Sequence, residues 1–413
     1  MNSLWSHRFR TLTAERAFYY LGKVVEKIAL LLLLPVSYAV MHAYSLIRGK
    51  KYRIGEINAQ SLGGWSYKLD GFLRRVEKND AENQVNYIFV MHSKRIANKY
   101  FYELMKRHVN VIENPFVRLM LLPLARVHNS FQAKGLTNCT EKIGQSLEAV
   151  PWFNDHDIAR GEHLLKELGL DSKDAWYVCF FARDNAYNES TSVGAELDYY
   201  KTYHACRNAD IDNYITAIKF ILENGGYVIR MGSVVKKRIS YFHPRLIDYP
   251  FSGYRSDFAD VYLACHCKFF IGNGSGILDL SGISDVPIGM VDLPQYYAGI
   301  TRKNMLYIPK LMKFSYNGEY VSVKKYFDLF EPSSLTSLDI IEIMKKNDII
   351  FEDNSENDIL MITKAFYQRF VTKSVTDEEW AAWQEGADCC RPFFHKGCCY
   401  IWGPFIDKHR YLM

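Results

Sequence analysis

The 413-residue sequence lacks several patterns that would assign it a function directly. It has no P-loop lysine, no full dinucleotide-binding glycine fingerprint, no internal repeat and no low-complexity tract. Its nine cysteines include the doublets Cys389/Cys390 and Cys398/Cys399, but their spacing is not that of zinc-binding pairs. A metal site or a disulfide staple at the doublets is therefore the minor alternative, and we expect no metal and no cofactor.

The folded body also lacks an excess of positive charge. The formal net charge is +5, yet residues 1–53 alone hold nine Lys/Arg against Glu15 and Glu26, so residues 54–413 come to about −2. A nucleic-acid-binding protein needs a basic face on its folded domain. We therefore expect no nucleic-acid partner, and we assign the basic character to the N-terminal tail.

One long apolar run follows this tail. Residues 28–47 are largely apolar and carry no formally charged side chain, and their length is about that needed to cross a bilayer. Basic residues flank both ends, so charge gives no orientation. We expect this run to meet a membrane surface, as a surface-lying, re-entrant or spanning helix, while a buried core helix is the alternative. A cleaved signal peptide fits poorly, because 27 residues precede the run.

Strand-like apolar runs alternate with amphipathic helical segments through most of the remaining chain, which predicts parallel α/β sheets. The expected strands are 52–57, 85–91, 109–112, 176–182, 227–231, 268–271 and 286–291, and the clearest helices are 97–107, 211–223, 257–266, 335–346 and 357–371. The expected parts are a basic tail with a membrane-associated helix (1–51), an N-terminal Rossmann-like domain (52–150), a C-terminal Rossmann-like domain (151–330) and a helical region packing back on the core (331–413).

Three strand ends in the C-terminal domain carry residues suited to holding a phosphate. Arg183 follows the strand 176–182, and Arg230 with Gly232 closes the strand 227–231. The third strand leads into Asn273, Gly274, Ser275 and Gly276, where a helix begins and its free N–H groups favour an anion. Ligands in such sheets lie beyond the carboxyl ends of the strands, so we expect one nucleotide diphosphate site here. A structural ion pair for each arginine, and a plain helix cap at Ser275, are the alternatives.

Weaker candidates flank these corners. Arg207 and Arg255 could add positive charge to the donor site, and Asp260 could orient an arginine or a ribose hydroxyl. Asp210 and Asp212 have the spacing of a metal-binding Asp-x-Asp motif, but they open a helix, where acids suit the helix dipole.

At these residues the sequence resembles a family of bacterial glycosyltransferases found with cell-surface polysaccharide genes. The strings that carry the resemblance are FARDNAY, YHACRNADIDNYITAIKFILENGGYVIRMG and YRSDFADVYLACHCKFFIGNGSGI, and the resemblance extends over about 51–413. More distantly, Arg183 after an apolar strand resembles an arginine of fucosyltransferases with two Rossmann-like domains facing a cleft, the GT-B architecture. The resemblance implies an α/β fold of this GT-B-like type, preceded by the N-terminal apolar helix.

The resemblance also implies an activity. The C-terminal domain would bind a nucleotide-sugar donor, and the N-terminal domain a surface-glycan or lipid-linked acceptor, at the cytoplasmic face of a bacterial inner membrane. Leaving-group charge would be stabilised by Arg183 and Arg230 without an obligatory metal. A non-catalytic, membrane-anchored sugar- or nucleotide-binding component of a glycan assembly complex is the alternative, and another phosphate-handling enzyme such as an epimerase is a weaker one.

An inverting transfer needs a base to take the proton from the acceptor hydroxyl. Glu56, His92 and Asp184 are the candidates, because each lies in or just after a predicted strand. Members of the resembled family often carry histidine where this chain has Glu56, which is a departure from the pattern. A lone histidine such as His92 is also common at the edge of a core.

Overall fold

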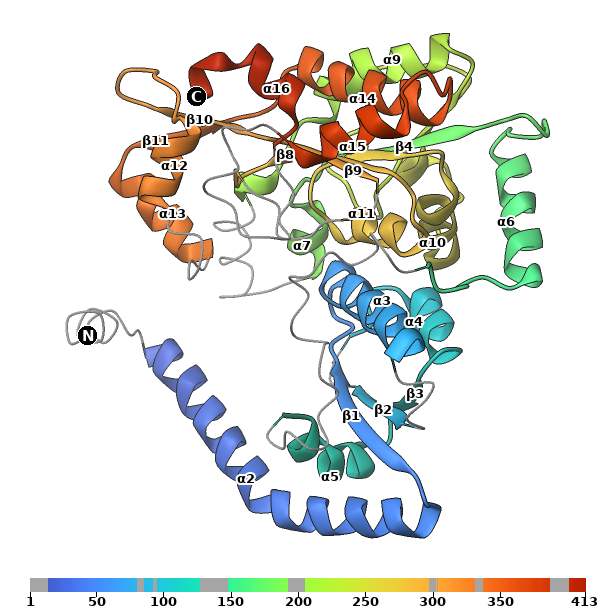
Figure 1. The fold of residues 1–413 in the computed structure, drawn as a ribbon, viewed down its shortest axis with the longest axis vertical. Helices are drawn as coiled ribbons and strands as arrows, with labels where there is room; N and C mark the ends of the chain where they lie inside the picture. Colours follow the sequence, from blue (N-terminus) through green and yellow to red (C-terminus); the bar gives the residue numbers. More distant parts are fainter. Residues whose placement is uncertain are drawn as a thin grey trace. The chain divides into compact units, whose positions relative to one another are not determined.

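The computed structural model describes residues 14–79, 85–91, 95–126, 148–191, 205–296, 302, 304–330, 337–386 and 401–413. Within these ranges the protein is α/β, with two parallel sheets and one antiparallel strand pair (Figure 1). The α/β class and the apolar N-terminal helix expected from the sequence are confirmed.

The chain divides into two compact units. Unit 1 comprises 1–60, 76–95 and 105–137, and unit 2 comprises 61–75, 96–104 and 138–413. The domain boundaries expected from the sequence stay a prediction.

Unit 1 contains a three-stranded parallel sheet in the order β1-β2-β3. Its elements are α2 (Ala14–Arg48), β1 (Lys51–Ile57), β2 (Val85–Met91), β3 (Asn110–Ile112) and α5 (Pro115–Arg126). Two helices, α3 (Leu62–Asn79) and α4 (Lys99–Lys106), contribute residues to both units.

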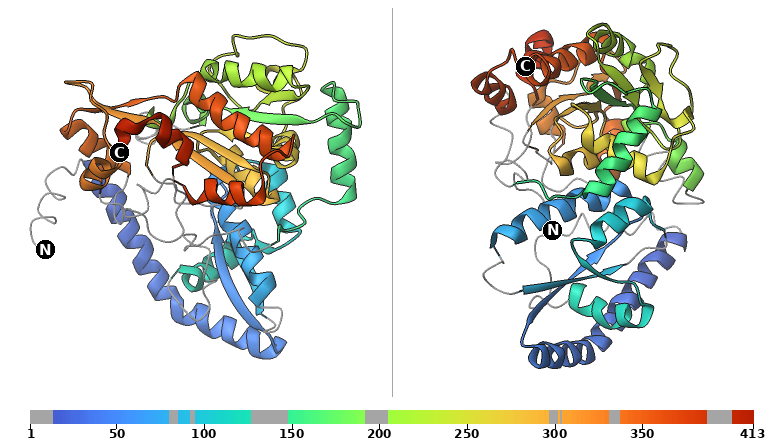
Figure 2. Two further views of the ribbon diagram at one scale, coloured as in Figure 1. Left: turned by 45° about the horizontal axis from the view of Figure 1, so that its top comes forward. Right: turned by 90° about the vertical axis from the view of Figure 1, so that its right-hand side faces the viewer.

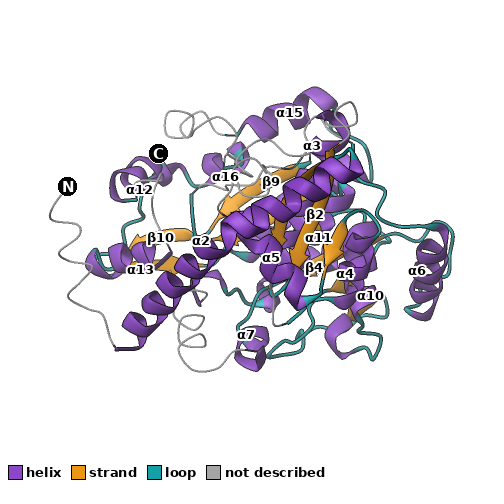
Figure 3. Cartoon of the chain, turned by 90° about the horizontal axis from the view of Figure 1, so that it is seen from below, coloured by secondary structure: helices purple, strands orange, loops and turns teal. Residues whose placement is uncertain are grey.

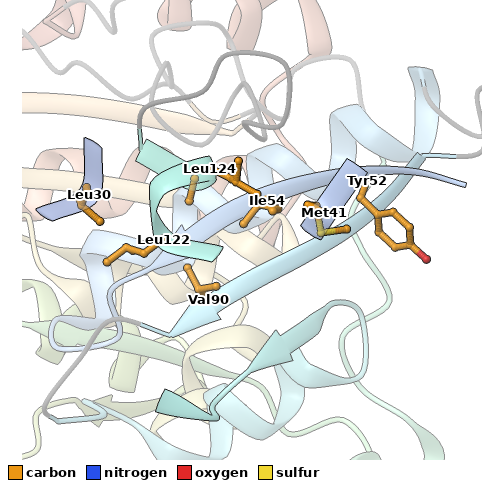
Figure 4. Packing of buried hydrophobic residues seen from close by; sticks show 8 residues of the cluster. Leu30, Met41, Tyr52, Ile54, Val90, Leu122 and Leu124 are labelled. Carbon is orange, nitrogen blue, oxygen red and sulfur yellow. The ribbon is translucent and has the colours of Figure 1, made fainter. Parts of the chain in front are cut away.

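The core of unit 1 joins α2 and α5 to the sheet. Figure 4 shows Leu30 and Met41 of α2 in one cluster with Ile54 of β1, Val90 of β2 and Leu122 of α5. Ile54 and Val90 are fully buried, so the helices cover the apolar side chains of the strands. An ion pair adds to this contact, because Arg126 of α5 binds both Glu26 of α2 and Glu56 of β1, and the bond to Glu56 raises the pKa of the Arg126 guanidinium.

α2 is long and bent. It runs over 35 residues as two straight stretches joined by a bend, and Pro35 lies inside it (Figure 1). Proline has no N–H to donate to the preceding turn and its ring clashes with that turn, so we attribute the bend to Pro35.

Unit 2 is built on a six-stranded parallel sheet in the order β6-β5-β4-β7-β8-β9. The strands are β4 (Tyr177–Phe181), β5 (Tyr227–Arg230), β6 (Leu246–Asp248), β7 (Phe270–Gly272), β8 (Ile288–Leu293) and β9 (Met305–Pro309). An antiparallel pair, β10 (Leu311–Phe314) with β11 (Ile349–Glu352), follows the sheet. The helices are α6 (Asp155–Glu167), α7 (Ala186–Thr191), α9 (Ile215–Glu223), α10 (Asp257–His266), α11 (Gly276–Ser281), α12 (Val323–Leu329), α13 (Ser337–Lys346), α14 (Glu356–Phe370), α15 (Asp377–Glu385) and α16 (Gly403–Lys408).

Helices cover both faces of this sheet. α9 and α14 pack together on one face, and α10 and α11 pack together on the other (Figures 1 and 2). A parallel sheet covered on both faces needs strands that are apolar throughout. β4 meets this need, because Tyr177, Val178, Cys179 and Phe180 are all buried.

Local side-chain caps fix where the helices begin. Ser256 caps α10 by accepting the N–H of Ala259 at 3.1 Å. Ser355 and Asp358 form a reciprocal capping box at the start of α14. Asp358 also accepts a bond from His409 near the C-terminus at 2.8 Å, which ties the last residues to α14. Such caps satisfy helix N–H groups that would otherwise lack partners.

A buried ion network links α3 to residues beyond α11 within unit 2. Asp70, whose side chain is fully buried, binds Arg74 at 3.0 Å and Arg302 at 2.6 Å. Arg74 continues to Asp285 at 2.8 Å. Two buried arginines therefore depend on one buried carboxylate.

We predict that Asp70→Asn lowers the free energy of unfolding by about 3 kcal/mol, because it leaves buried guanidinium charge uncompensated. Denaturant titration measures this change. The matched control is Asp328→Asn, which breaks the exposed Lys324–Asp328 pair of α12 and should change stability little. Equal effects of the two substitutions would contradict the role given to the network.

Candidate functional site

The three corners expected to hold phosphate lie at one edge of the unit 2 sheet. β5, β4 and β7 are consecutive neighbours and all run parallel. Their carboxyl ends therefore meet side by side, and with them the residues that follow: Arg183, Arg230 with Gly232, and 273–276. The sequence expectation that these corners come together is supported by this strand order.

The buried side chain of Asn273 ties two of these corners to a third segment. Its Oδ1 accepts the backbone N–H of Arg183 at 2.8 Å, and its Nδ2 donates to the backbone oxygen of Arg207 at 2.7 Å. Arg207 in turn donates from Nη2 to the carbonyl of Gly274. One amide group thus sets the position of the chain after β4 relative to the chain after β7.

Gly232 allows the backbone conformation that follows β5. Its φ is +148°, and a Cβ at this position would lie 2.7 Å from Cγ1 of Val235 and 3.3 Å from Cγ of Pro250. Only glycine fits both the angle and the space. Its role is therefore to turn the chain after Arg230.

A pocket of about 340 Å³ opens at the ends of β4 and β5. Four segments line it: the loop after β4, the end of β5 with the loop after it, the segment before α9 and the segment before α14. The lining residues are Ala182, Asp184, Asn208, Ala209, Asp210, Ile211, Arg230, Lys236, Lys237 and Asp353. Of the donor-site residues expected from the sequence, Arg230 lines this pocket, and so does the candidate base Asp184.

The basic side chains of the pocket are held by nearby oxygens. Arg230 donates from Nη1 to Asp248 at 2.8 Å and to the carbonyl of Lys237 at 3.3 Å. Lys237 binds Asp210 at 2.5 Å and Asp212 at 2.8 Å, and these bonds raise the pKa of Lys237. The lysine side chain is about half exposed, so it can exchange these carboxylates for a bound anion at little desolvation cost.

Of the residues that line the pocket, two have a buried side-chain atom with no hydrogen-bond partner among the described residues. These atoms are Nε of Arg230, whose side chain is 1% exposed, and Oδ1 of Asn208. A buried polar atom without a partner costs about 1–3 kcal/mol. One donor and one acceptor in a pocket with half-exposed lysines suit a ligand that carries both an anionic group and hydrogen-bonding groups.

The corner after β7 is more enclosed than the sequence suggests. Ser275 caps α11, with its Oγ accepting the N–H of Leu278 at 3.4 Å. A Cβ on Gly276 would lie 2.5 Å from the backbone nitrogen of Gly63, so the start of α3 packs directly on the start of α11. Burial raises the pKa of the nearby Asp279 carboxyl to about 6, against the lowering effect of Arg302 and Arg207.

Arg255 and Asp260 form a separate cluster near the start of α10. Asp260 accepts Nη2 of Arg255 at 2.9 Å and the hydroxyl of Tyr249 at 2.8 Å. Burial raises the pKa of Asp260 to about 6, although Arg255 and Tyr249 favour its charged form. These residues satisfy one another and do not line the pocket.

The three candidate bases have different surroundings. Both oxygens of Asp184 accept backbone N–H groups, from Ala186 at 3.0 Å and Lys236 at 2.7 Å. Glu56 of unit 1 holds Arg126 through both its oxygens. His92 lies outside the described residues, as do both cysteine doublets.

The residues that could bind a metal are engaged otherwise. Asp210 and Asp212 both bind Lys237, and Asp210 also caps the turn before α9 by accepting the N–H of Asp212. Within the described ranges, no group of three or more His, Cys, Asp or Glu side chains is placed to hold a metal ion.

Sequence reasoning missed Asn208, Lys236 and Lys237. Each lies in a loop without a recognisable motif, and each reaches the pocket only through the folding of that loop. The doublet of lysines a few residues beyond Arg230 was the available signal, because basic residues after a strand end can contact a phosphate.

Comparisons with known proteins give weak structural similarities. A glycosyl transferase family 9 protein from Veillonella parvula is 10% identical, with 72% of this chain and 96% of that chain covered and a TM-score of 0.39. The E. coli ADP-heptose lps heptosyltransferase II is 13% identical, with 76% and 99% covered and a TM-score of 0.34. The iron-containing dodecameric glycosyltransferase TibC of enterotoxigenic E. coli is 12% identical, with 77% of each chain covered and a TM-score of 0.34. No family model and no curated protein matches the sequence.

We predict that Asn273→Ala lowers the free energy of unfolding by about 2 kcal/mol, because it leaves the partly buried N–H of Arg183 without its acceptor. It should also speed amide hydrogen exchange at 182–184 and 205–209. Denaturant titration and exchange mass spectrometry measure both. Asn317→Ala, in an exposed turn, is the control, and unchanged exchange in the Asn273 variant would contradict the tie between the corners.

Proposed function

We propose that the protein is a glycosyltransferase that moves a sugar from a nucleotide-sugar donor to a hydroxyl of a surface-glycan or lipid-linked acceptor. The donor binds in unit 2, and its nucleoside diphosphate occupies the pocket at the ends of β4 and β5. The acceptor chemistry belongs to unit 1, which also carries the apolar helix α2.

The observation that carries the proposal is the pocket itself. It lies at the carboxyl edge of a doubly covered parallel sheet, where such folds bind nucleotides. It combines half-exposed lysines with Nε of Arg230 and Oδ1 of Asn208, which have no hydrogen-bond partner in the described part of the chain. Lysine and arginine donors suit a diphosphate, and an amide oxygen suits a base or ribose donor.

The reaction needs the diphosphate to leave with its charge stabilised. We assign this role to Arg183, Arg230 and the residues 273–276 that close the same edge, with Arg207 held against Gly274. The base is His92 in this proposal, because both oxygens of Glu56 are held by Arg126. Asp184 is given a structural role instead, because both its oxygens are occupied by backbone N–H groups.

The sequence resemblance to polysaccharide glycosyltransferases agrees with this assignment. The apolar run and the basic tail support a location at the cytoplasmic face of a bacterial inner membrane, where a lipid-linked saccharide would be the acceptor. The alternative is a non-catalytic sugar- or nucleotide-binding component. It would bind its ligand in the same pocket but would catalyse no reaction.

We predict that the purified protein hydrolyses at least one nucleotide sugar slowly, and that Arg183→Ala abolishes this hydrolysis. Replacing Lys236 and Lys237 together with alanine should weaken donor binding by about tenfold, because two charge-assisted contacts to phosphate are lost. Released nucleoside diphosphate and the shift in melting temperature across a donor panel measure these effects. Lys324→Ala, on an exposed face of α12, is the control.

The outcomes separate the candidate functions. Donor binding without hydrolysis would support the non-catalytic component, and conversion of the donor without release of nucleoside diphosphate would support an epimerase. A protein that no nucleotide sugar stabilises at millimolar concentration would contradict the pocket assignment, since a ligand at about 100 times its dissociation constant adds about 2.7 kcal/mol.

We also predict that chelation leaves donor hydrolysis unchanged. Asp210 and Asp212 neutralise Lys237 rather than standing ready for a cation, so the positive charge that the leaving group needs comes from side chains. Hydrolysis rates before and after EDTA treatment check this. A loss of rate that Mg²⁺ or Mn²⁺ restores would contradict it.

A further inference from the structure

We propose that α2 is an in-plane membrane helix that seats unit 1 on an anionic lipid surface and does not cross the bilayer. This adds a mode of membrane contact to the proposed function. The biological purpose of that contact rests on the proposed function. The physical claim itself depends only on α2 and the residues that pack against it.

One face of α2 is attached to unit 1 along most of its length. Its buried and half-buried residues recur at helical spacing: Glu26, Leu30, Leu33, Leu34, Ser37, Met41 and Ser45. From Glu26 to Ser45 this stripe is about 29 Å long at 1.5 Å per residue. α5 lies beside α2, as Figure 3 shows, and Arg126 of α5 holds Glu26.

This attachment conflicts with a transmembrane placement. The segment that is long and apolar enough to cross is Val24–Arg48, with a mean hydropathy of 1.9, and the packed stripe occupies nearly all of it. Crossing a hydrocarbon layer of about 30 Å would carry the Arg126 ion pairs and the edge of the sheet into lipid. Buried ion pairs and open sheet edges are strongly disfavoured there.

The outward face of α2 is apolar instead of polar. Twelve of the 23 large apolar side chains that are exposed among the described residues belong to this helix, including Leu32 at 74% and Ile47 at 82%. The polar residues Glu26, Ser37 and Ser45 lie on the packed face. A water-facing helix has the reverse arrangement, so this face requires an apolar partner.

The charges around the apolar face identify that partner as anionic lipid. Lys27, Arg48, Lys50 and Lys51 are all exposed, and they flank the apolar run 28–47. Glu26, the acid within the 24–48 segment, is paired with Arg126 on the packed face. Apolar side chains between exposed cations are the pattern of helices that lie in the headgroup region.

The experiment is flotation of the full-length protein with vesicles of phosphatidylcholine alone or with about one third phosphatidylglycerol. We expect binding to the anionic vesicles, weakened at high salt, and reduced about tenfold or more by Leu32→Glu. Phe242→Glu is the matched control, because Phe242 is 86% exposed in unit 2, and its binding should equal that of the unchanged protein.

A second readout separates in-plane from spanning helices. Epitopes at Met1 and Met413 should both be protected from protease in intact bacterial spheroplasts and both be cleaved after lysis. An epitope exposed on intact spheroplasts at one end only would overturn the proposal in favour of a span. Failure to bind either vesicle, or loss of self-association instead of lipid binding in Leu32→Glu, would overturn it in favour of a protein partner.

The test is independent of the donor site. Lys236→Ala with Lys237→Ala should leave vesicle binding unchanged, and Leu32→Glu should leave nucleotide-sugar binding unchanged. Loss of donor binding alone therefore counts against the proposed function, and loss of vesicle binding alone counts against the in-plane helix.

Discussion

The arrangement of the candidate site depends on the buried amide of Asn273. Parallel pairing brings the ends of β5, β4 and β7 to one edge, but pairing stops where the strands stop. Beyond that point Asn273 holds the chain after β4 through the N–H of Arg183 and holds the turn at Arg207 through its carbonyl. Asp184 and Asn208, which line the pocket, directly follow these two anchored positions.

Charge in unit 2 is divided between structural and ligand-facing roles. Asp70 and Asp285 neutralise Arg74 and Arg302 in the ion network, and Asp260 pairs with Arg255 near α10. The lysines at the pocket differ, because their carboxylate partners lie near the surface, where such pairs are weak. A phosphate can therefore compete for these lysines but not for the buried arginines of the ion network.

Much of the fold follows from sequence periodicity, and the exceptions have physical reasons. The β2 and α10 boundaries match the expected ranges, because apolar periodicity and a Ser256 cap mark them clearly. The strands β6 and β9 and the β10-β11 pair were not predicted. They are three to five residues long, and their pairing depends on distant partners instead of local pattern.

The candidate site could also be predicted from the sequence only in part. The sequence places Arg183, Arg230 and Asn273 at strand ends, and the strand order brings them to one edge. It does not show that Arg230 is buried against Asp248, that Asp184 binds two backbone N–H groups, or that Gly63 packs on Gly276. Each of these contacts joins residues in different loops, so no local pattern records it.

α2 gives unit 1 an exposed apolar surface, and unit 2 has a pocket whose lining suits a soluble anionic ligand. The glycosyltransferase that we propose draws its donor from solution and its acceptor from a membrane, and it needs both features in one chain. The most direct test of the central claim is photo-crosslinking with an azido-nucleoside diphosphate followed by peptide mapping. We expect label within 182–184, 208–211 or 230–237, competed by unlabelled nucleotide. Competed label confined to other segments would contradict it.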